Sequence, residues 1–206
     1  MSQRFVIVDY GMGNLHSIYK KLQITGVNAI ISSSPKVISS ADKIILPGVG
    51  HFKKAMENLK NANLIELLYD NVIEKKKPIL GICLGMQLMA KFSKEGNTNG
   101  LGWVDCEISN FKVNNSLRFK IPHMGWNQIS IKKESQLMRN IPENSEFYFV
   151  HSFHIKNGKQ EDILNETHYE YNFTSTIEKN NIFGVQYHPE KSHTVGLKVL
   201  ENFVNI

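Results

Sequence analysis

Apolar runs of strand length and segments with helix-period apolar residues alternate along the first part of the chain, which predicts strands followed by helices. This order is typical of a parallel sheet covered by helices. The expected strands are Phe5 to Tyr10, Asn28 to Ile31, Lys43 to Leu46 and Ile79 to Gly81; the expected helices are Asn14 to Leu22, Phe52 to Leu59, Leu64 to Lys75 and Leu84 to Phe92.

The pattern changes after Trp103, where short alternating runs between turn residues predict further strands. The clearest are Phe147 to His151, Phe173 to Ile177 and Ile182 to Gln186, and Thr194 to Val204 is a final helix expected to pack on the sheet. No repeat or low-complexity linker divides the chain. We therefore expect an α/β fold with one domain over residues 1–206, built on a mostly parallel central sheet flanked by helices.

Composition narrows the functions that fit. The 206 residues are 41% hydrophobic, enough for one sizeable core. The net charge of +5 comes from dispersed lysines without an aromatic-spaced basic stripe, so nucleic-acid binding is not expected. The first residues carry no signal-peptide pattern, and no apolar run reaches membrane length, so we expect a cytoplasmic protein. Two cysteines and scattered histidines give neither a disulfide framework nor metal-ligand spacing, so no metal and no cofactor are expected.

Cys83 ends an apolar run and has Gly81 and Gly85 two residues to either side. Such glycines are typical of a sharp strand-to-helix turn that holds its apex residue in strained geometry. Helix amides and the helix dipole at that position favour the thiolate. The spacing indicates a nucleophile elbow with Cys83 as the nucleophile, although a cysteine in an apolar run is often a small core residue.

A nucleophilic thiol needs a base, and His188 ends an apolar run in the order His188-Pro189-Glu190. In extended backbone, residues i and i+2 face the same way, so Glu190 can accept the ring N–H and fix the tautomer. A solvated histidine followed by a helix-opening glutamate is the alternative for this pair alone. With Cys83, the pair has the chain order and roles of nucleophilic acyl transfer.

Acyl transfer also needs amide donors for the oxyanion. Gly48, Val49 and Gly50 form a glycine loop between an apolar run and a helical segment. One of their N–H groups, together with that of Leu84, would complete an oxyanion hole. An ordinary strand-to-helix turn has the same sequence features.

Six motifs together resemble the class I (triad-type) glutamine amidotransferases. GICLGMQ, HPEKS and PGVGHF carry the resemblance to the class; DYGMGNLHS, PHMGWN and FVHSF are similar to the glutaminase subunits of imidazole glycerol phosphate synthases. The resemblance runs from Val6 to Phe203, and no triad position departs from it. It implies glutamine hydrolysis by Cys83, His188 and Glu190, with the amino-acid end of glutamine held by Gln87 and the backbone of His151, Ser152 and Phe153. On sequence alone Gln87 could also lie on a helix surface.

The resemblance also implies a partner, because free ammonia becomes unreactive ammonium and this chain has no second domain to use it. The implied partner is a (β/α)8-barrel cyclase that forms a heterodimer with the chain and makes imidazole glycerol phosphate in histidine biosynthesis. Positions that match residues facing the barrel are Asn14, His123, Met124, Gly125, Trp126, Asn127, Tyr148 and Lys191, although Trp126 could equally be a core residue. The oxyanion loop at Val49 is then expected to be misaligned until the partner is docked.

Three other functions fit parts of the sequence. A paralogous glutaminase that supplies a sugar-modifying amidotransferase of surface glycan synthesis would carry the same triad. A non-catalytic regulatory subunit would not need Cys83, His188 and Glu190 intact. A cysteine peptidase with a similar elbow commonly places its histidine next to the cysteine, where Leu84 stands here.

Overall fold

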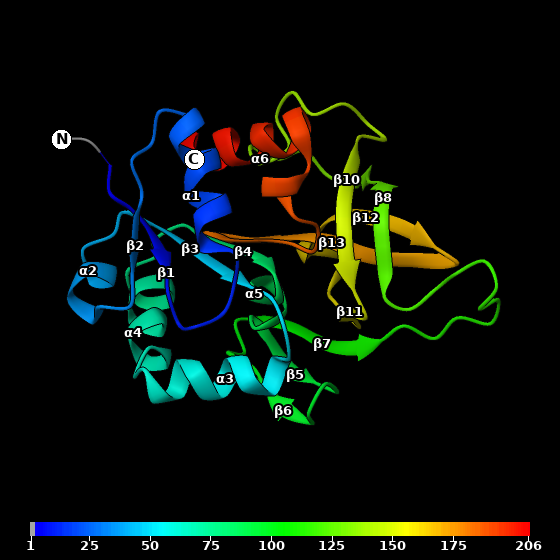
Figure 1. Cartoon of the computed structure of the whole chain (residues 1–206), viewed down its shortest axis with the longest axis horizontal. Helices are drawn as coiled ribbons and strands as arrows, with labels where there is room; N and C mark the ends of the chain where they lie inside the picture. The colour runs from blue at the N-terminus through cyan, green and yellow to red at the C-terminus, as the bar shows by residue number, and fades with distance from the viewer. Residues whose placement is uncertain (1–2) are drawn as a thin grey trace.

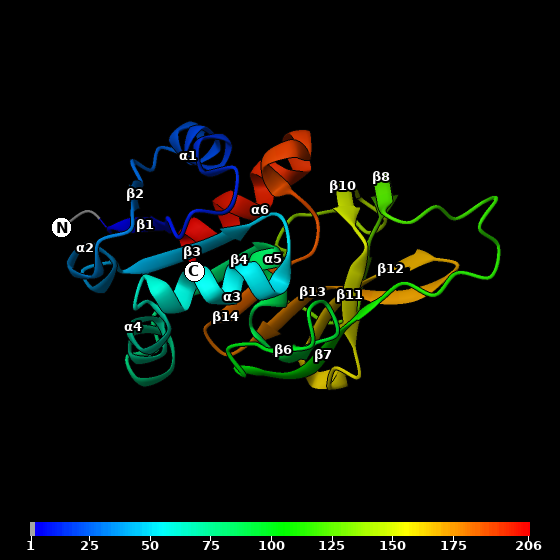
Figure 2. The same ribbon diagram turned by 60° about the horizontal axis from the view of Figure 1, so that its bottom comes forward.

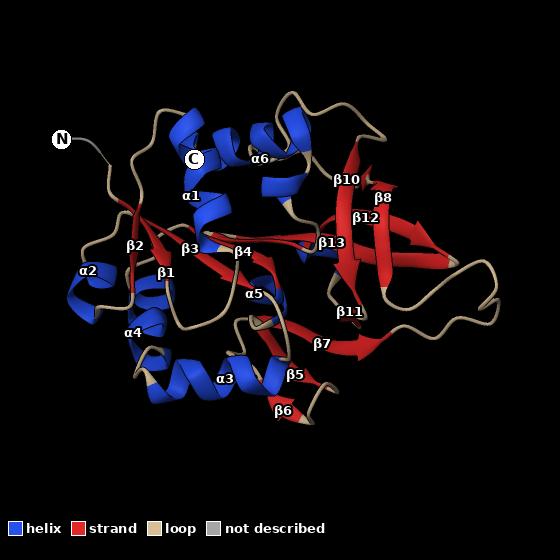
Figure 3. Ribbon diagram, viewed as in Figure 1, coloured by secondary structure: helices blue, strands red, loops and turns tan. Residues whose placement is uncertain are grey.

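The computed structural model describes residues 3–206, so Met1 and Ser2 of the expected domain and N-terminal segment lie outside it. Within this range, 12 strands form one sheet, and β8 (His123–Gln128) pairs with β10 (Glu146–His151) in a second sheet of two strands. Helices gather around one half of the large sheet, whereas the other half of the molecule is strand and loop (Figure 3). No helix within residues 3–206 is long and apolar enough to span a membrane.

One half of the large sheet is parallel, as the sequence predicted. Its strand order is β2 (Ile30–Ser32), β1 (Phe5–Val8), β3 (Lys43–Gly48), β4 (Ile79–Cys83) and β14 (Ile182–Val185). The last of these comes from far along the chain and lies beside β4, with Val185 opposite Ile82. Consequently the residues that follow β4 and β14 emerge at the same edge of the sheet, where open α/β sheets bind ligands.

The other half of the sheet is largely antiparallel. It continues from β14 through β13 (Tyr171–Lys179), β11 (Phe153–Lys156) and β7 (Val104–Asn110), followed by β5 (Ala90–Ser93), which is parallel to β7, and β6 (Thr98–Asn99). Beside this path, β12 (Ile163–Tyr169) pairs with β13 and β9 (Ser130–Ile131). The central sheet is therefore mixed, with its parallel strands gathered under the helices.

Helices cover both faces of the parallel half (Figures 1 and 2). α1 (Leu15–Ile24) and α6 (His193–Asn205) pack on one face with Phe5 and Ile7. α3 (Phe52–Asn61) and α4 (Ile65–Tyr69) pack on the other face with Val6 and Val8. Because side chains alternate along a strand, β1 contributes to two separate hydrophobic clusters, which explains its continuous apolar run.

The structure corrects two expected helices. The helix predicted for Leu84 to Phe92 is a single turn, α5 (Leu84–Gln87), after which the chain enters β5. Residues 88–90 are apolar and fully buried, and such a run does not distinguish helix from strand by periodicity. The helix predicted for Leu64 to Lys75 is α4 followed by a π-helical turn, Asp70–Glu74. A short helix that begins at a proline, α2 (Pro35–Ser39), was not predicted.

Candidate active site

Cys83 occupies the elbow that the sequence predicted, with φ 55° and ψ −110°. The glycines on either side of Cys83 are required because neighbouring backbone atoms leave no space for a Cβ. A Cβ on Gly85 would lie 1.8 Å from the Leu46 carbonyl oxygen, and one on Gly81 would lie 2.7 Å from the Met86 nitrogen. The turn therefore accepts no larger side chain on either side of the thiol.

The electrostatic support of Cys83 differs from the expectation. α5 has only four residues, so its dipole is much weaker than that of a long helix. Instead, the side-chain amide of Gln186 donates to Sγ of Cys83 at 3.6 Å, which favours negative charge on the sulfur. Sequence reasoning missed Gln186, although it lies two residues before His188 and so shares its side of an extended run.

His188 and Glu190 form a buried pair, with Nδ1 of the ring 2.8 Å from Oε1 of the carboxylate and side-chain exposures of 2% and 1%. The contact is the one the sequence predicted, but the backbone differs, because Pro189–Lys191 is a 3₁₀ turn rather than an extended strand. Since Nδ1–H donates to Glu190, Nε2 is the nitrogen left for chemistry. Within residues 3–206, this buried Nε2 has no hydrogen-bond partner.

The protonation state of His188 follows from its neighbours. Burial disfavours the imidazolium, but Cys83 and Glu190 outweigh burial and raise the pKa of His188 from 6.5 to about 10. At neutral pH the ring is therefore an imidazolium, the counter-ion that a thiolate needs. In contrast, burial raises the pKa of Cys106 to about 12, so that second thiol stays protonated.

Cys83 lines a pocket of about 250 Å3. The pocket brings together the elbow, the expected base His188, the glycine loop and the expected substrate segment. Its lining residues are Val49, Gly50, Cys83, Leu84, Gln87, Glu95, Val150, His151, Ser152, Phe153 and His188. No sequence motif pointed to Glu95, whose carboxylate accepts the Phe52 N–H at 2.9 Å and so caps the start of α3.

Gln87 is buried rather than on a helix surface. Its amide nitrogen donates to the Phe153 carbonyl at 3.0 Å and to Oε1 of Gln186 at 2.9 Å. A carbonyl oxygen only accepts hydrogen bonds, so the orientation of the Gln87 amide is fixed.

The glycine loop lies directly against the elbow, since Gly48 pairs with Cys83 in the register of β3 and β4. A Cβ on Gly48 would lie 2.6 Å from the Tyr10 hydroxyl and 2.9 Å from Cβ of Leu84. Gly50 has φ 107°, a conformation that favours glycine. The loop is thus placed where one of its amides could act beside that of Leu84, and its oxyanion role stays a prediction.

The residues expected at a partner interface divide between two sides of β8. Met124 and Trp126 face outward with 62% and 45% exposure, so Trp126 is not a core residue. Trp126 stacks on His193 with ring centroids 4.8 Å apart, and Lys191 lies over the Tyr148 ring. Asn14 is exposed and Gly125 is half-buried, whereas the side chains of His123 and Asn127 point inward. By strand alternation, Met124 and Trp126 are the side chains of this block that face outward, and the interface itself stays a prediction.

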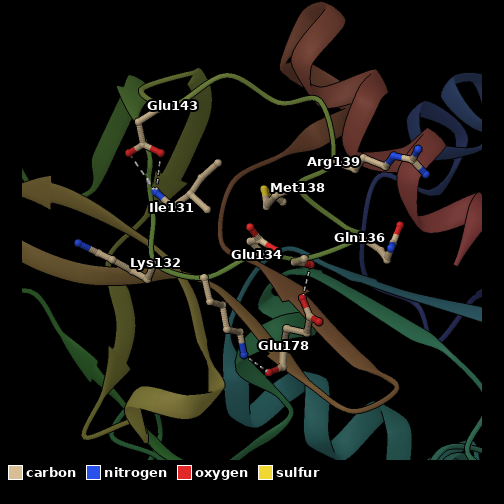
Figure 4. A pocket seen from close by; sticks show the side chains of 10 residues that line it. Ile131, Lys132, Glu134, Gln136, Met138, Arg139, Glu143 and Glu178 are labelled. Atoms are coloured by element: carbon tan, nitrogen blue, oxygen red, sulfur yellow. Dashed lines mark hydrogen bonds between the residues drawn. The ribbon is translucent and has the colours of Figure 1, made fainter.

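A larger hollow, of about 940 Å3, lies elsewhere, beside residues 131–143 (Figure 4). Its charged groups hold the loop in place: Lys133 donates to the Glu178 carbonyl at 3.1 Å, and Glu143 accepts the Ile131 N–H at 3.2 Å. None of the residues predicted for the site lines it. Size alone is thus a poor guide to the reactive site of this chain.

A family model described as glutamine amidotransferase class-I matches residues 6–206, and the chain belongs to that family. Within it, the chain is 49% identical to imidazole glycerol phosphate synthase subunit HisH 2 of Methanococcus maripaludis, over 96% of this chain and 97% of the relative. It is 46% identical to subunit HisH 1 of Campylobacter jejuni, over 97% and 98%.

Solved structures agree on the fold. A glutamine amidotransferase crystal structure superposes with a TM-score of 0.75 at 12% identity, over 98% of this chain and 99% of that one. PurLQS from Thermotoga maritima gives a TM-score of 0.70 at 20% identity, over 100% and 99%. The predicted class I amidotransferase fold is confirmed.

Proposed function

We propose that this chain is the glutaminase subunit of an imidazole glycerol phosphate synthase, with Cys83 as nucleophile, His188 as base and Glu190 as its orienting group. One observation carries the proposal: Cys83, held at the elbow with a positive φ, and His188, paired with the buried Glu190, line the same pocket. The names of its relatives support the same function.

In the proposed reaction, the Cys83 thiolate attacks the side-chain carbonyl carbon of glutamine and forms a C–S bond. The oxyanion rests on amides of Leu84 and of the Gly48 to Gly50 loop. The C–N bond then breaks as Nε2–H of His188 protonates the leaving ammonia. His188 next removes a proton from water, which attacks the thioester and releases glutamate. Glu190 keeps its charge throughout and stabilises the imidazolium.

The proposed partner is a (β/α)8-barrel cyclase that receives the ammonia and completes imidazole glycerol phosphate for histidine biosynthesis. The relatives are named as subunits, which supports a heterodimer. The exposed Met124 and Trp126 on the outer face of β8 supply an apolar and aromatic surface of the kind enriched at interfaces. We place this assembly in the cytoplasm, since a nucleophilic thiol needs a reducing compartment.

The test is glutamine hydrolysis by the complex of this chain with its cyclase. Cys83→Ala should abolish glutamate release, because no other group in the pocket can form the thioester, whereas Cys106→Ser should leave the rate unchanged. Full turnover by Cys83→Ala would overturn the proposed nucleophile. The relatives carry numbered names, HisH 1 and HisH 2, so the assay should also offer a glycan-pathway acceptor. Product from that acceptor alone would favour the paralogous glutaminase.

A further inference from the structure

Two buried histidines take no part in the proposed chemistry. The register of β8 and β10 places His123 opposite His151, and their exposures are 3% and 6%. Nδ1 of His123 lies 3.0 Å from Nε2 of His151. Two adjacent buried imidazoles require a defined pattern of protons, because two donors or two acceptors facing each other would leave polar groups unpaired.

The surrounding carbonyls determine that pattern. Nδ1 of His151 lies 2.7 Å from the Phe153 carbonyl, which only accepts, so Nδ1 carries the proton and Nε2 of the neutral ring accepts. His123 must then donate from Nδ1 and accept at Nε2. The Asn127 amide supplies that donor at 3.1 Å, and its second N–H goes to the His168 carbonyl at 3.0 Å.

Both rings are held neutral. Burial lowers the pKa of His123 to about 4 and lowers that of His151 well below its usual range. A proton on Nε2 of His151 would face His123 and force that ring to donate toward Asn127. Asn127 would have to turn over and lose its bond to the His168 carbonyl. The hydrogen bonds therefore run in one direction, from Asn127 to His123 to His151 to Phe153.

The Phe153 carbonyl connects this series to the reactive site. The Phe153 carbonyl oxygen accepts one hydrogen bond from His151 and a second from the Gln87 amide. These two bonds occupy both lone-pair directions of that oxygen. The other N–H of Gln87 goes to Gln186, whose own amide reaches Sγ of Cys83. Since both donors of the Gln87 amide are occupied, its oxygen is left to accept a hydrogen bond from a ligand in the pocket that Gln87 lines.

We propose that His123 and His151 are positioning residues that hold the Phe153 carbonyl and the Gln87 amide in the arrangement that binds the ammonium of the substrate amino acid. The proposal rests on the proposed function. It also gives β8 two roles, because the strand that presents Met124 and Trp126 outward carries the first members of the series, Asn127 and His123, on its inner side.

The first test is the tautomer of each ring, read from ¹⁵N NMR of the full chain labelled on histidine. Both His123 and His151 should be neutral and protonated at Nδ1, whereas free neutral histidine prefers Nε2–H. An Nε2–H tautomer on either ring would overturn the proposal. This result does not depend on turnover, so it stays interpretable even if Cys83→Ala were to show that the proposed function is wrong.

The second test is the kinetics of glutamine hydrolysis by the complex with the cyclase. His123→Leu keeps the bulk but removes the donor to His151, so KM for glutamine should rise about tenfold, with kcat within about threefold of the original. His123→Asn can still donate from its amide and should restore KM to within about threefold. His168→Leu is the matched control, because this exposed histidine enters the series only through its main-chain carbonyl, whereas its ring pairs with Asn172 outside the series. An unchanged KM in His123→Leu, or equal damage by Leu and Asn, would overturn the positioning role.

Discussion

Gly196 lets α6 pack against the turn that carries His188, the proposed base, and its partner Glu190. A Cβ at this position would lie 2.0 Å from the Pro189 carbonyl oxygen and 2.7 Å from Cβ of Ser192. Real Cβ atoms essentially never approach within 3.0 Å, so Gly196→Ala must push the turn and the helix apart by about 1 Å. Ser192 cannot absorb the shift freely, because its hydroxyl donates to the His188 carbonyl at 2.6 Å and accepts the Tyr148 N–H at 3.0 Å.

The magnitudes follow from this geometry. The obstruction is backbone rather than a flexible side chain, so overpacking should cost about 3 kcal/mol, the upper part of its usual range. Alanine regains about 1 kcal/mol over glycine inside a helix. The net loss of about 2 kcal/mol lowers Tm by about 4–8 °C for a chain of this size. A displacement of about 1 Å at His188 should lower kcat about 100-fold.

Two measurements check this prediction: thermal denaturation of the chain, and glutamine hydrolysis by its complex with the cyclase at saturating glutamine. Thr194→Ala, an exposed position in the same helix, is the control and should change neither. If Gly196→Ala lowered Tm but left kcat intact, the base would not depend on this packing. If neither changed, the contact between α6 and the turn would itself be wrong.

Three further predictions concern the same site. Glu190→Gln should lower the pKa of His188 from about 10, as measured by NMR titration of the ring. Because the pKa of His188 is raised in the folded protein, the stability that its protonation contributes is complete below about pH 6.5 and is lost as pH rises through about 10. A wild-type ring that titrates near 6.5 would contradict this. Gln87→Leu should raise KM for glutamine about tenfold with a smaller change in kcat, and steady-state kinetics showing an unaltered KM would exclude its substrate role. Gly85→Ala should cost about 3 kcal/mol or more, since its Cβ meets the Leu46 carbonyl, and urea unfolding at wild-type stability would refute the close approach.

The sequence was most informative where chemistry is local. The elbow could be predicted because Gly81 and Gly85 lie two residues to either side of Cys83. The turn at Cys83 leaves no space for a side chain at either position. The pairing of His188 with Glu190 could be predicted because only one residue separates them, although the 3₁₀ turn that joins them could not.

Side-chain contacts that depend on strand pairing could not be predicted from the sequence. Gln186 reaches Cys83 only because β14 pairs with β4, and His123 meets His151 only because β8 pairs with β10. Neither pairing can be predicted from the local sequence pattern. The same sequence paired one residue out of register would place every side chain on the opposite face of the sheet. The end of α5 was missed for a related reason: the continuous apolar stretch after Gln87 fits a buried helix or a buried strand equally well.

The position of β14 also has a consequence for folding. This strand lies between β4 and β13 in the sheet, yet it is synthesised after both of them. Until it emerges, β4 has one unpaired edge, and Cys83, the proposed nucleophile, lacks its proposed base. An unpaired strand edge favours association with other chains, so the sheet is not protected until β14 has paired. Closure of the sheet and completion of the proposed triad therefore depend on the same strand, because the pairing of β14 with β4 brings the segment that carries His188 to the edge of the sheet where Cys83 lies.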